Sequence, residues 1–281
     1  MIHIISFFVV FIPLAKSQDI HQTLIYANEQ SESGSIDEAI GLYHRVLFFD
    51  SLHIYSFEAC KNLVSCYIFK NDYVKAREYS KIAGNYATND SLRNEMIFQT
   101  AYLYLLENDY NYALIELFGI NEDGSDYFSR KKDFYLGTAY FQQTDFKKSF
   151  DYFVACIDST DKQNRDALDE NFAEIFHIQK RYNPKTARTL SMIFPGTGQI
   201  YSGDLRGALN SLLLTTGLAF LYINTAINYS FIDATVSVLP WFQRYYQGGF
   251  ENAGKATVIK KERKIKEHYQ QILSVIKQTK L

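Results

Sequence analysis

The residues that come closest to a chemical site form the segment FPGTGQIYSGDLRG, which holds four glycines. Glycine-rich loops bind phosphate through backbone N–H groups, and a P-loop also needs a lysine and a hydroxyl residue directly after its second glycine. Gly198 and Gly203 have the P-loop spacing, but Asp204 and Leu205 stand in place of the lysine and the hydroxyl residue. A dinucleotide-binding loop needs a third glycine where Tyr201 stands. The segment therefore argues against nucleotide binding.

The cysteines and histidines are the next candidates for chemistry, and their spacing matches no metal-ligand pattern. Cys60 and Cys66 are expected on one helix, where six residues separate them by about 9 Å along the axis, which is beyond disulfide reach. With Cys156 they make an odd number. We expect all three to be small buried hydrophobic residues, and we expect no metal, no cofactor and no catalytic group.

The elements that must position these residues belong to two regions of opposite charge. Residues 18–183 carry 16 Lys and Arg against 26 Asp and Glu, whereas residues 184–281 carry 12 against 5. An acidic front and a basic back suggest two parts in different surroundings. The acidic region argues against nucleic acid as a partner, because phosphate binding relies on Lys and Arg.

The first 17 residues have the pattern of a signal peptide. An apolar run from Ile4 to Leu14 precedes Ala15-Lys16-Ser17, which is a small-x-small cleavage pattern. We expect export, with the mature chain beginning near Gln18. A buried first helix and an uncleaved membrane anchor are the alternatives.

The acidic region contains an internal repeat. It has no proline between Pro13 and Pro184, which favours helices throughout. Four times, a polar turn is followed by a small residue that opens an apolar-periodic helix, and a second helix precedes each turn. The small residues recur at intervals of 37, 37 and 36, at Ala39, Ala76, Ala113 and Ser149.

This repeat resembles the tetratricopeptide (TPR) family, whose first helix carries L-G-x-x-Y and whose second carries a small residue, an aromatic and another small residue. Leu136, Gly137 and Tyr140 match the first helix, and Ala39 with Tyr43 matches the second. The family's proline and tryptophan are absent, so a generic array of α-hairpins stays open. The resemblance implies a solenoid with a concave groove for a peptide or protein. Its candidate partner-binding residues are Asn62, Tyr67, Tyr104 and Tyr140.

The basic region contains a long uncharged run, from Gly207 to Ile232. Its first 22 residues would form a helix of about 33 Å, which matches the core of a bilayer. The following segment is less apolar and holds Asp233, Pro240 and Arg244, with Trp241 where an interfacial aromatic belt is expected. We expect a transmembrane helical hairpin over residues 206–250, the alternative being a buried helix in a soluble core.

A second resemblance covers about residues 190–255. The pattern P-G-x-G-Q-x-Y-x-G ahead of an apolar hairpin is similar to a segment of uncharacterised bacterial TPR-containing membrane proteins. The resemblance implies location and architecture, with glycines that set the turn of the chain at the membrane surface. The matching residues are Pro195, Gly196, Gly198, Gln199, Tyr201, Gly203 and Gly207.

The last 27 residues, 255–281, read as a basic amphipathic helix that lies on anionic lipid or packs on the repeats. Two complete spans would return this helix to the outside, whereas its positive charge favours the cytoplasm. One span with a re-entrant second arm is the alternative.

The expected fold class is all-α: a TPR-like α-solenoid over residues 18–183, a glycine-rich turn and transmembrane helical hairpin over residues 184–254, and a basic amphipathic tail helix. We expect a non-enzymatic scaffold at the bacterial inner membrane, with its repeats in the periplasm, that binds a protein or peptide in a cell-envelope process. Self-association through the hairpin stays open. The alternatives are a small membrane enzyme or transporter component using Asp204, Asp233 and Arg244, and a fully soluble exported helical-repeat protein.

Overall fold

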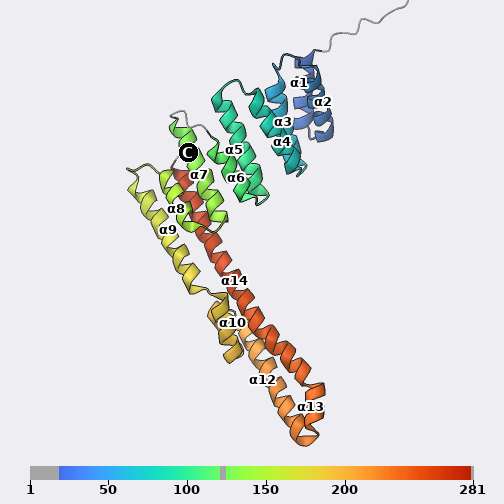
Figure 1. The fold of residues 1–281 in the computed structure, drawn as a ribbon, viewed down its shortest axis with the longest axis vertical. Helices are drawn as coiled ribbons and strands as arrows, with labels where there is room; N and C mark the ends of the chain where they lie inside the picture. Colours follow the sequence, from blue (N-terminus) through green and yellow to red (C-terminus); the bar gives the residue numbers. More distant parts are fainter. Residues whose placement is uncertain (1–18, 121–124, 280–281) are drawn as a thin grey trace, which may run out of the picture. The chain divides into compact units, whose positions relative to one another are not determined.

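The computed structural model describes residues 19–120 and 125–279 of the chain. Every regular element within these ranges is an α-helix, so the all-α prediction is confirmed there (Figure 1). The chain divides into two compact units, Met1–Asp145 and Phe146–Leu281. The division falls inside the expected repeat region, at the fourth repeated turn. The expected signal peptide lies outside the described residues.

In the first unit, each helix packs against the next in chain order, and α1 also contacts α3 while α5 contacts α7. Contacts between elements near in sequence are typical of arrays of helical hairpins. The three small residues that mark the repeat on α2, α4 and α6 are fully buried, and the fourth, Ser149 in the second unit, is fully buried as well. The helices are α1 (Ile20–Glu32), α2 (Ile36–Phe49), α3 (Ser56–Phe69), α4 (Tyr73–Tyr86), α5 (Asp90–Leu106), α6 (Tyr110–Phe118) and α7 (Asp126–Gln142).

Alternate helices in this region end in the same turn, built around a residue with positive φ. These residues recur at intervals of 37, 37 and 36, at Gly34, Asn71, Asn108 and Thr144. The N–H of the following residue bonds to the carbonyl oxygen five residues back; Asp72 N to Tyr67 O, at 2.9 Å, is one example. This is the pattern of a Schellman turn, which satisfies carbonyl groups left over at a helix end. The repeat is therefore visible in backbone geometry as well as in sequence.

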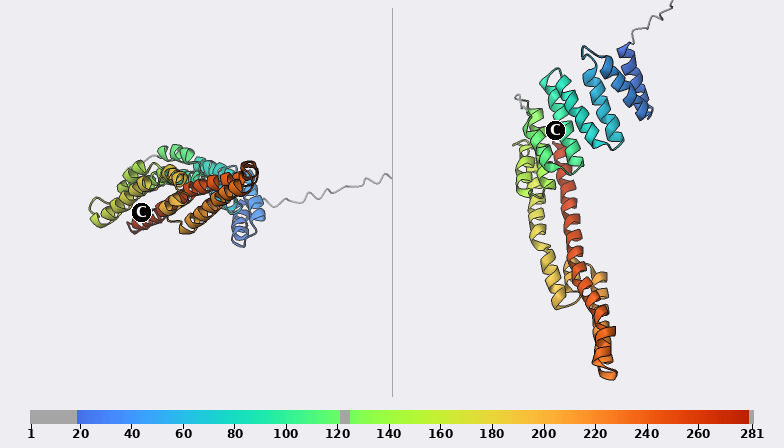
Figure 2. Two further views of the ribbon diagram at one scale, coloured as in Figure 1. Left: turned by 90° about the horizontal axis from the view of Figure 1, so that it is seen from below. Right: turned by 45° about the vertical axis from the view of Figure 1, so that its right-hand side comes forward.

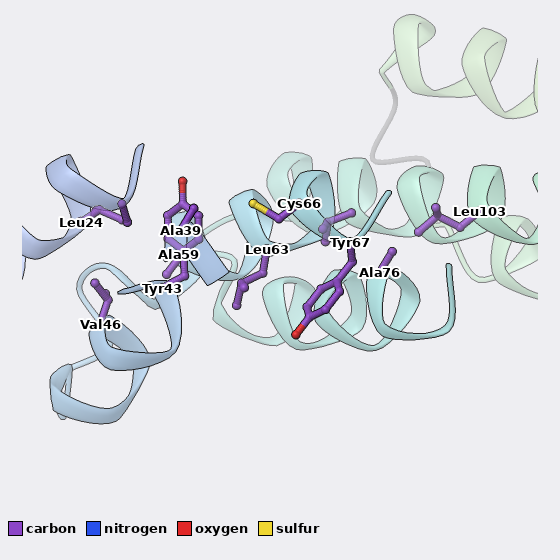
Figure 3. Packing of buried hydrophobic residues seen from close by; sticks show 12 residues of the cluster. Leu24, Ala39, Tyr43, Val46, Ala59, Leu63, Cys66, Tyr67, Ala76 and Leu103 are labelled. Carbon is purple, nitrogen blue, oxygen red and sulfur yellow. The ribbon is translucent and has the colours of Figure 1, made fainter. Parts of the chain in front are cut away.

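The core of the first unit combines small residues with a few large ones (Figure 3). Ala39, Ala59 and Ala76 are fully buried and let helix axes approach closely, while Tyr43 and Leu63 fill the space between them. The hydroxyl of Tyr43 donates to Asn28 Oδ1 at 2.8 Å, so its polar end is also satisfied.

The prediction for the cysteines is confirmed. Cys60 and Cys66 share α3, all three cysteines are free, and each is no more than 1% exposed. Burial raises the pKa of the Cys60 thiol to about 12, which removes its nucleophilic thiolate at neutral pH.

A buried carboxylate closes the turn between α2 and α3. Asp50, 3% exposed, accepts hydrogen bonds from Ile54 N, Tyr55 N and Ser56 Oγ at 3.0, 2.8 and 2.8 Å. Burial opposes its ionisation, but the three donors outweigh that effect and the pKa of Asp50 is lowered from its ordinary value. The ionised side chain thus replaces a missing helix cap on α3.

In the second unit, α14 contacts α9, α10, α11, α12 and α13. Figures 1 and 2 show α9 beside one part of α14 and α12 beside another, with α13 joining α12 to α14. The helices are α8 (Phe146–Ala155), α9 (Lys162–Arg181), α10 (Pro184–Ile193), α11 (Thr197–Ser202), α12 (Leu205–Asn228), α13 (Phe231–Ser237) and α14 (Leu239–Gln278).

The expected second arm and tail helix are one continuous helix, α14, which runs unbroken through residues 254 and 255. Pro240 does not break it, because it stands in the first turn, where its missing N–H has no partner to lose. His268 Nδ1 lies 2.9 Å from Asn171 Oδ1 and links α14 to α9.

Replacing Thr144 with glycine should stabilise the protein by about 1 kcal/mol, since a β-branched residue is strained at a φ of 64° and glycine is not. Chemical denaturation of Thr144→Gly against the parent measures this gain. The reciprocal change, Gly34→Thr, should destabilise by a similar amount; equal stability of all three proteins would contradict the role of the turn.

Asp50→Asn should lower the free energy of unfolding by about 1–3 kcal/mol at pH 7, because a charge-assisted cap is lost. Since the folded-state pKa of Asp50 is lowered, its contribution is present above the unfolded pKa and disappears as the pH falls through the folded pKa. Urea titrations at pH 7 and pH 3 should therefore show a smaller difference from the parent at pH 3. A difference independent of pH would rule out the ionised cap.

Candidate functional site

The glycine-rich segment folds as a short helix, α11, between two glycines in the left-handed region. Gly196 has a φ of 96° and Gly203 a φ of 78°. A Cβ on Gly196 would lie 2.6 Å from the carbonyl oxygen of Ala208, so its backbone approaches α12 directly. Gly196 and Gly203 thus allow the chain to turn twice within ten residues.

Gly198 allows α11 to touch the backbone of α10. A Cβ there would lie 2.0 Å from Ala187 O and 2.6 Å from Ser191 Oγ. Its N–H instead donates to Ser191 Oγ at 2.9 Å. Only glycine leaves room for this contact, which the sequence pattern alone does not reveal.

Gln199 is buried at the meeting point of three helices. Its Oε1 accepts from Ser191 Oγ on α10, and its Nε2 donates to Gly249 O on α14, both at 2.8 Å. The side chain is 2% exposed, so these bonds replace water at both ends of the amide. Gln199 therefore joins α10, α11 and α14.

Tyr201 joins the same segment to the chain between α9 and α10. Its hydroxyl donates to Arg181 O and accepts from Asn183 N at 3.1 Å. Its ring centroid lies 6.5 Å from that of Tyr182. The phenol thus holds the α9–α10 corner against α11.

Asp204 begins α12. Its Oδ1 accepts from Gly207 N at 2.9 Å, and a Cβ on Gly207 would lie 2.2 Å from its Oδ2. Gly203 and Asp204 also repeat the turn of the first unit, with Asp204 N donating to Gln199 O at 2.8 Å. Of the seven residues of the pattern, all but Pro195 have a contact or backbone conformation that depends on their type.

A polar pocket of about 430 Å³ lies beside this segment, between α11, α12 and α14. It brings together Asp204 and Arg244, two of the three charged residues considered for membrane chemistry, whereas Asp233 is exposed on α13 and is absent from its lining. The remaining lining residues are Gln199, Gly207, Asn210, Ser211, Leu214, Tyr245, Gly248, Gly249 and Asn252.

The sequence analysis did not place Ser211 in the lining of this pocket. It is 8% exposed, and its Oγ is a buried oxygen without a hydrogen-bond partner among the described residues. Thr215, one turn further along, is also buried with an unpartnered hydroxyl. The available signal was their spacing of four from Gly207, which places all three on one face of α12.

The opposite faces of α12 are apolar and exposed. α12 is the one helix in the described part of the chain that is long and apolar enough to cross a membrane. Only 11% of its apolar stretch of 18 residues is buried. Its exposed large hydrophobic residues are Leu205, Leu209, Leu212, Leu213, Leu214, Phe220, Leu221, Ile223 and Ile227. A helix in a soluble core would instead bury most of this surface.

The four candidate partner-binding residues lie on successive first helices of the repeats and pack between helices. Asn62 donates to Asn28 Oδ1 at 2.9 Å. Tyr67 is 7% exposed and stacks on Tyr79, with ring centroids 5.4 Å apart.

Tyr104 is half-buried between Tyr112 and the guanidinium of Arg77, which lies 4.5 Å from its ring centroid. Tyr140 is half-buried on α7. The four are not gathered in one pocket of the described residues, and their role in binding stays a prediction.

The first unit has a polar hollow that the sequence did not single out. This pocket, of about 410 Å³, lies among α4, α5 and α6 beside the pair formed by Lys81 and Glu116, whose charged atoms are 2.7 Å apart. The neighbouring Thr100 and Ser80 form a buried hydrogen bond of 2.9 Å. Both charge signs are thus presented at one hollow.

No protein-family model matches the chain. No curated protein matches its sequence either.

Gly198→Ala should destabilise the protein by about 1–3 kcal/mol, because the added methyl group meets the immovable carbonyl of Ala187. Gly248→Ala is the matched control: it lies in α14, a Cβ there meets nothing within 4 Å, and better helix propensity should leave stability equal or slightly higher. Thermal unfolding of the full chain compares the two. Equal effects would show that the close contact of α10 with α11 does not constrain the fold.

Proposed function

We propose that this protein is a membrane-anchored helical-repeat scaffold, which holds a protein or peptide partner at the bacterial inner membrane and catalyses no reaction. The observation that carries the proposal is the exposed apolar surface of α12 and the turn after it.

The exposed apolar area and the length of α12 support membrane anchoring. Each large apolar side chain left in water forgoes about 1.5–3 kcal/mol of burial free energy, so a row of them calls for a covering medium. The exposed surface continues past α12 through Tyr229, Phe231, Ile232 and Val236 to Trp241. With 24 residues, α12 is about 36 Å long, enough for a bilayer core of about 30 Å.

The distribution of polar side chains on α12 supports the same proposal. Ser211 and Thr215 are buried within the unit, while the neighbouring leucines are exposed. Asn228 Nδ2 donates to Asn224 O at 3.0 Å, so this amide also finds a partner within its own helix. Keeping polar groups away from lipid, or bonding them to the backbone of their own helix, lowers the cost of placing them in a membrane.

The repeat of about 37 residues in the first unit supports a scaffold function. Helical hairpins that repeat at this length resemble TPR modules, which present a groove to peptides or proteins. The acidic balance of this region favours a partner segment with basic charge. Identification of the bound partner would identify the cell-envelope process that the scaffold serves.

The expected signal peptide supports a periplasmic location of the repeats. Export would place the repeats in the periplasm, with the hairpin of α12, α13 and the start of α14 in the inner membrane. Tyr245 and Trp241 stack at 6.4 Å near the start of α14, where an interfacial aromatic pair is expected.

Phe220→Arg tests the anchor. Phe220 is 72% exposed, so in a soluble protein the change would alter stability by no more than about 0.5 kcal/mol. Within a bilayer, the arginine should oppose insertion by about 2.5–3.5 kcal/mol. We expect the parent to resist carbonate extraction of membranes and Phe220→Arg to be released.

Phe69→Arg is the control. Phe69 is similarly exposed, at 70%, but it lies on α3 outside the hairpin, so this variant should stay membrane-bound. Release of the parent by carbonate would overturn the anchor. Reporter fusions after Tyr182, Tyr229 and Leu281 complete the test: an external Tyr182 fusion supports periplasmic repeats, and a cytoplasmic one contradicts them.

A further inference from the structure

The polar pocket between α11, α12 and α14 lies where a lipid headgroup would meet the anchor. Asp204 and Arg206 are the last charged residues before the uncharged run of 26 residues that begins at Gly207. The pocket is lined by α12 residues from Gly207 to Leu214. It therefore opens beside the first turns of the apolar helix, at the level of the membrane surface under the proposed function.

The pocket is lined by one cationic and one anionic side chain, which do not form an ion pair with each other. Arg244 makes no ion pair within the described residues, and it is the one cationic side chain of the lining. Asp204 is the one anionic side chain, and the hydrogen bond from Gly207 N occupies only its Oδ1. The pocket thus offers one unpaired positive group and one carboxylate oxygen without a partner among the described residues.

One buried polar atom of the pocket lining lacks a hydrogen-bond partner among the described residues. Gln199 is fully used by Ser191 and Gly249 and offers nothing further. Ser211 Oγ, by contrast, is buried with no hydrogen-bond partner among the described residues, and unpaired buried hydroxyls are uncommon because they are costly. The amides of Asn210 and Asn252 stand at the more exposed positions of the lining.

We propose that this pocket binds the headgroup of a phosphatidylethanolamine lipid. The phosphate contacts Arg244 and accepts a hydrogen bond from Ser211, while the ammonium group contacts Asp204. A zwitterion fits one positive and one negative side chain better than an anionic headgroup, which Asp204 would repel, or a choline, whose methylated nitrogen cannot donate a hydrogen bond to the carboxylate. The acyl chains lie along the exposed leucines of α12.

The inference rests on the proposed function for the orientation of the lipid, but its test does not need a membrane. Full-length protein in detergent is titrated with dioctanoyl phosphatidylethanolamine, phosphatidylcholine or phosphatidylglycerol, and bound lipid is counted by native mass spectrometry. We expect one phosphatidylethanolamine per chain, bound at least about tenfold more tightly than the other two. Equal binding of all three lipids would overturn the proposal, even if carbonate extraction upholds the anchor.

Two variants separate the charges. Arg244→Gln and Asp204→Asn should each weaken phosphatidylethanolamine binding by about tenfold, and asparagine retains the helix-capping oxygen of Asp204. Asp204→Asn should also reduce the discrimination against phosphatidylglycerol. Lys255→Gln, an exposed cation on α14 outside the pocket, is the matched control and should bind as the parent does. Equal loss in all three variants would show a nonspecific charge effect and contradict the site.

Ser211→Ala supplies a readout that a merely structural role would not give. Without lipid it should unfold at a temperature equal to or above that of the parent, since it removes an unpaired hydroxyl. With phosphatidylethanolamine, the parent should gain more thermal stability than Ser211→Ala does. An identical gain in both proteins would remove Ser211 from the site. Soluble phosphoethanolamine is added as a competitor to distinguish the lipid from a free metabolite. Displacement of the lipid at equal concentration would overturn the assignment to a lipid, and retention of the lipid supports it.

Discussion

Five helix ends in the described part of the chain are closed by the same pair of backbone hydrogen bonds around a residue with positive φ, and the packing of the helices before and after each turn depends on them. The turn reverses the chain within a few residues. The residue after the positive-φ position is a serine or an aspartate, and it directly precedes the next helix. Because the bonds are between backbone groups, the turn forms around different residue types, with backbone strain where the residue is not glycine. Glycine, asparagine and threonine all occur at this position.

Much of the first unit was predictable because its signals are local. The small residues at intervals of 37 report close helix approach, and each of the three within the first unit is buried as expected. The turns were predicted as polar breaks, but their shared geometry was not, because asparagine and threonine do not announce a left-handed conformation as glycine does. The cap at Asp50 was missed for a related reason: its donors come from four to six residues later, across a turn of no regular type.

The second unit was harder to read because its contacts join distant residues. The pattern around Gly198 and Gln199 suggested a turn, whereas the structure shows a joint of three helices in which Gln199 reaches Gly249, fifty residues away. No local pattern encodes that bond. The sequence analysis divided a second arm from a tail helix at residues 254 and 255, yet α14 is continuous, because Pro240 falls in its first turn and a Cβ on Gly248 would meet nothing within 4 Å.

The continuity of α14 has a mechanical consequence. Its 40 residues form a rod of about 60 Å. One part packs on α12 and α13, and His268, far along it, meets Asn171 on α9. When α14 tilts as one rigid body by about 5° about one end, its other end moves by about 5 Å, which is close to the rise of one helical turn. Any force that reorients the α12 hairpin is therefore felt at α9 as a displacement, without a change in the fold of either helix.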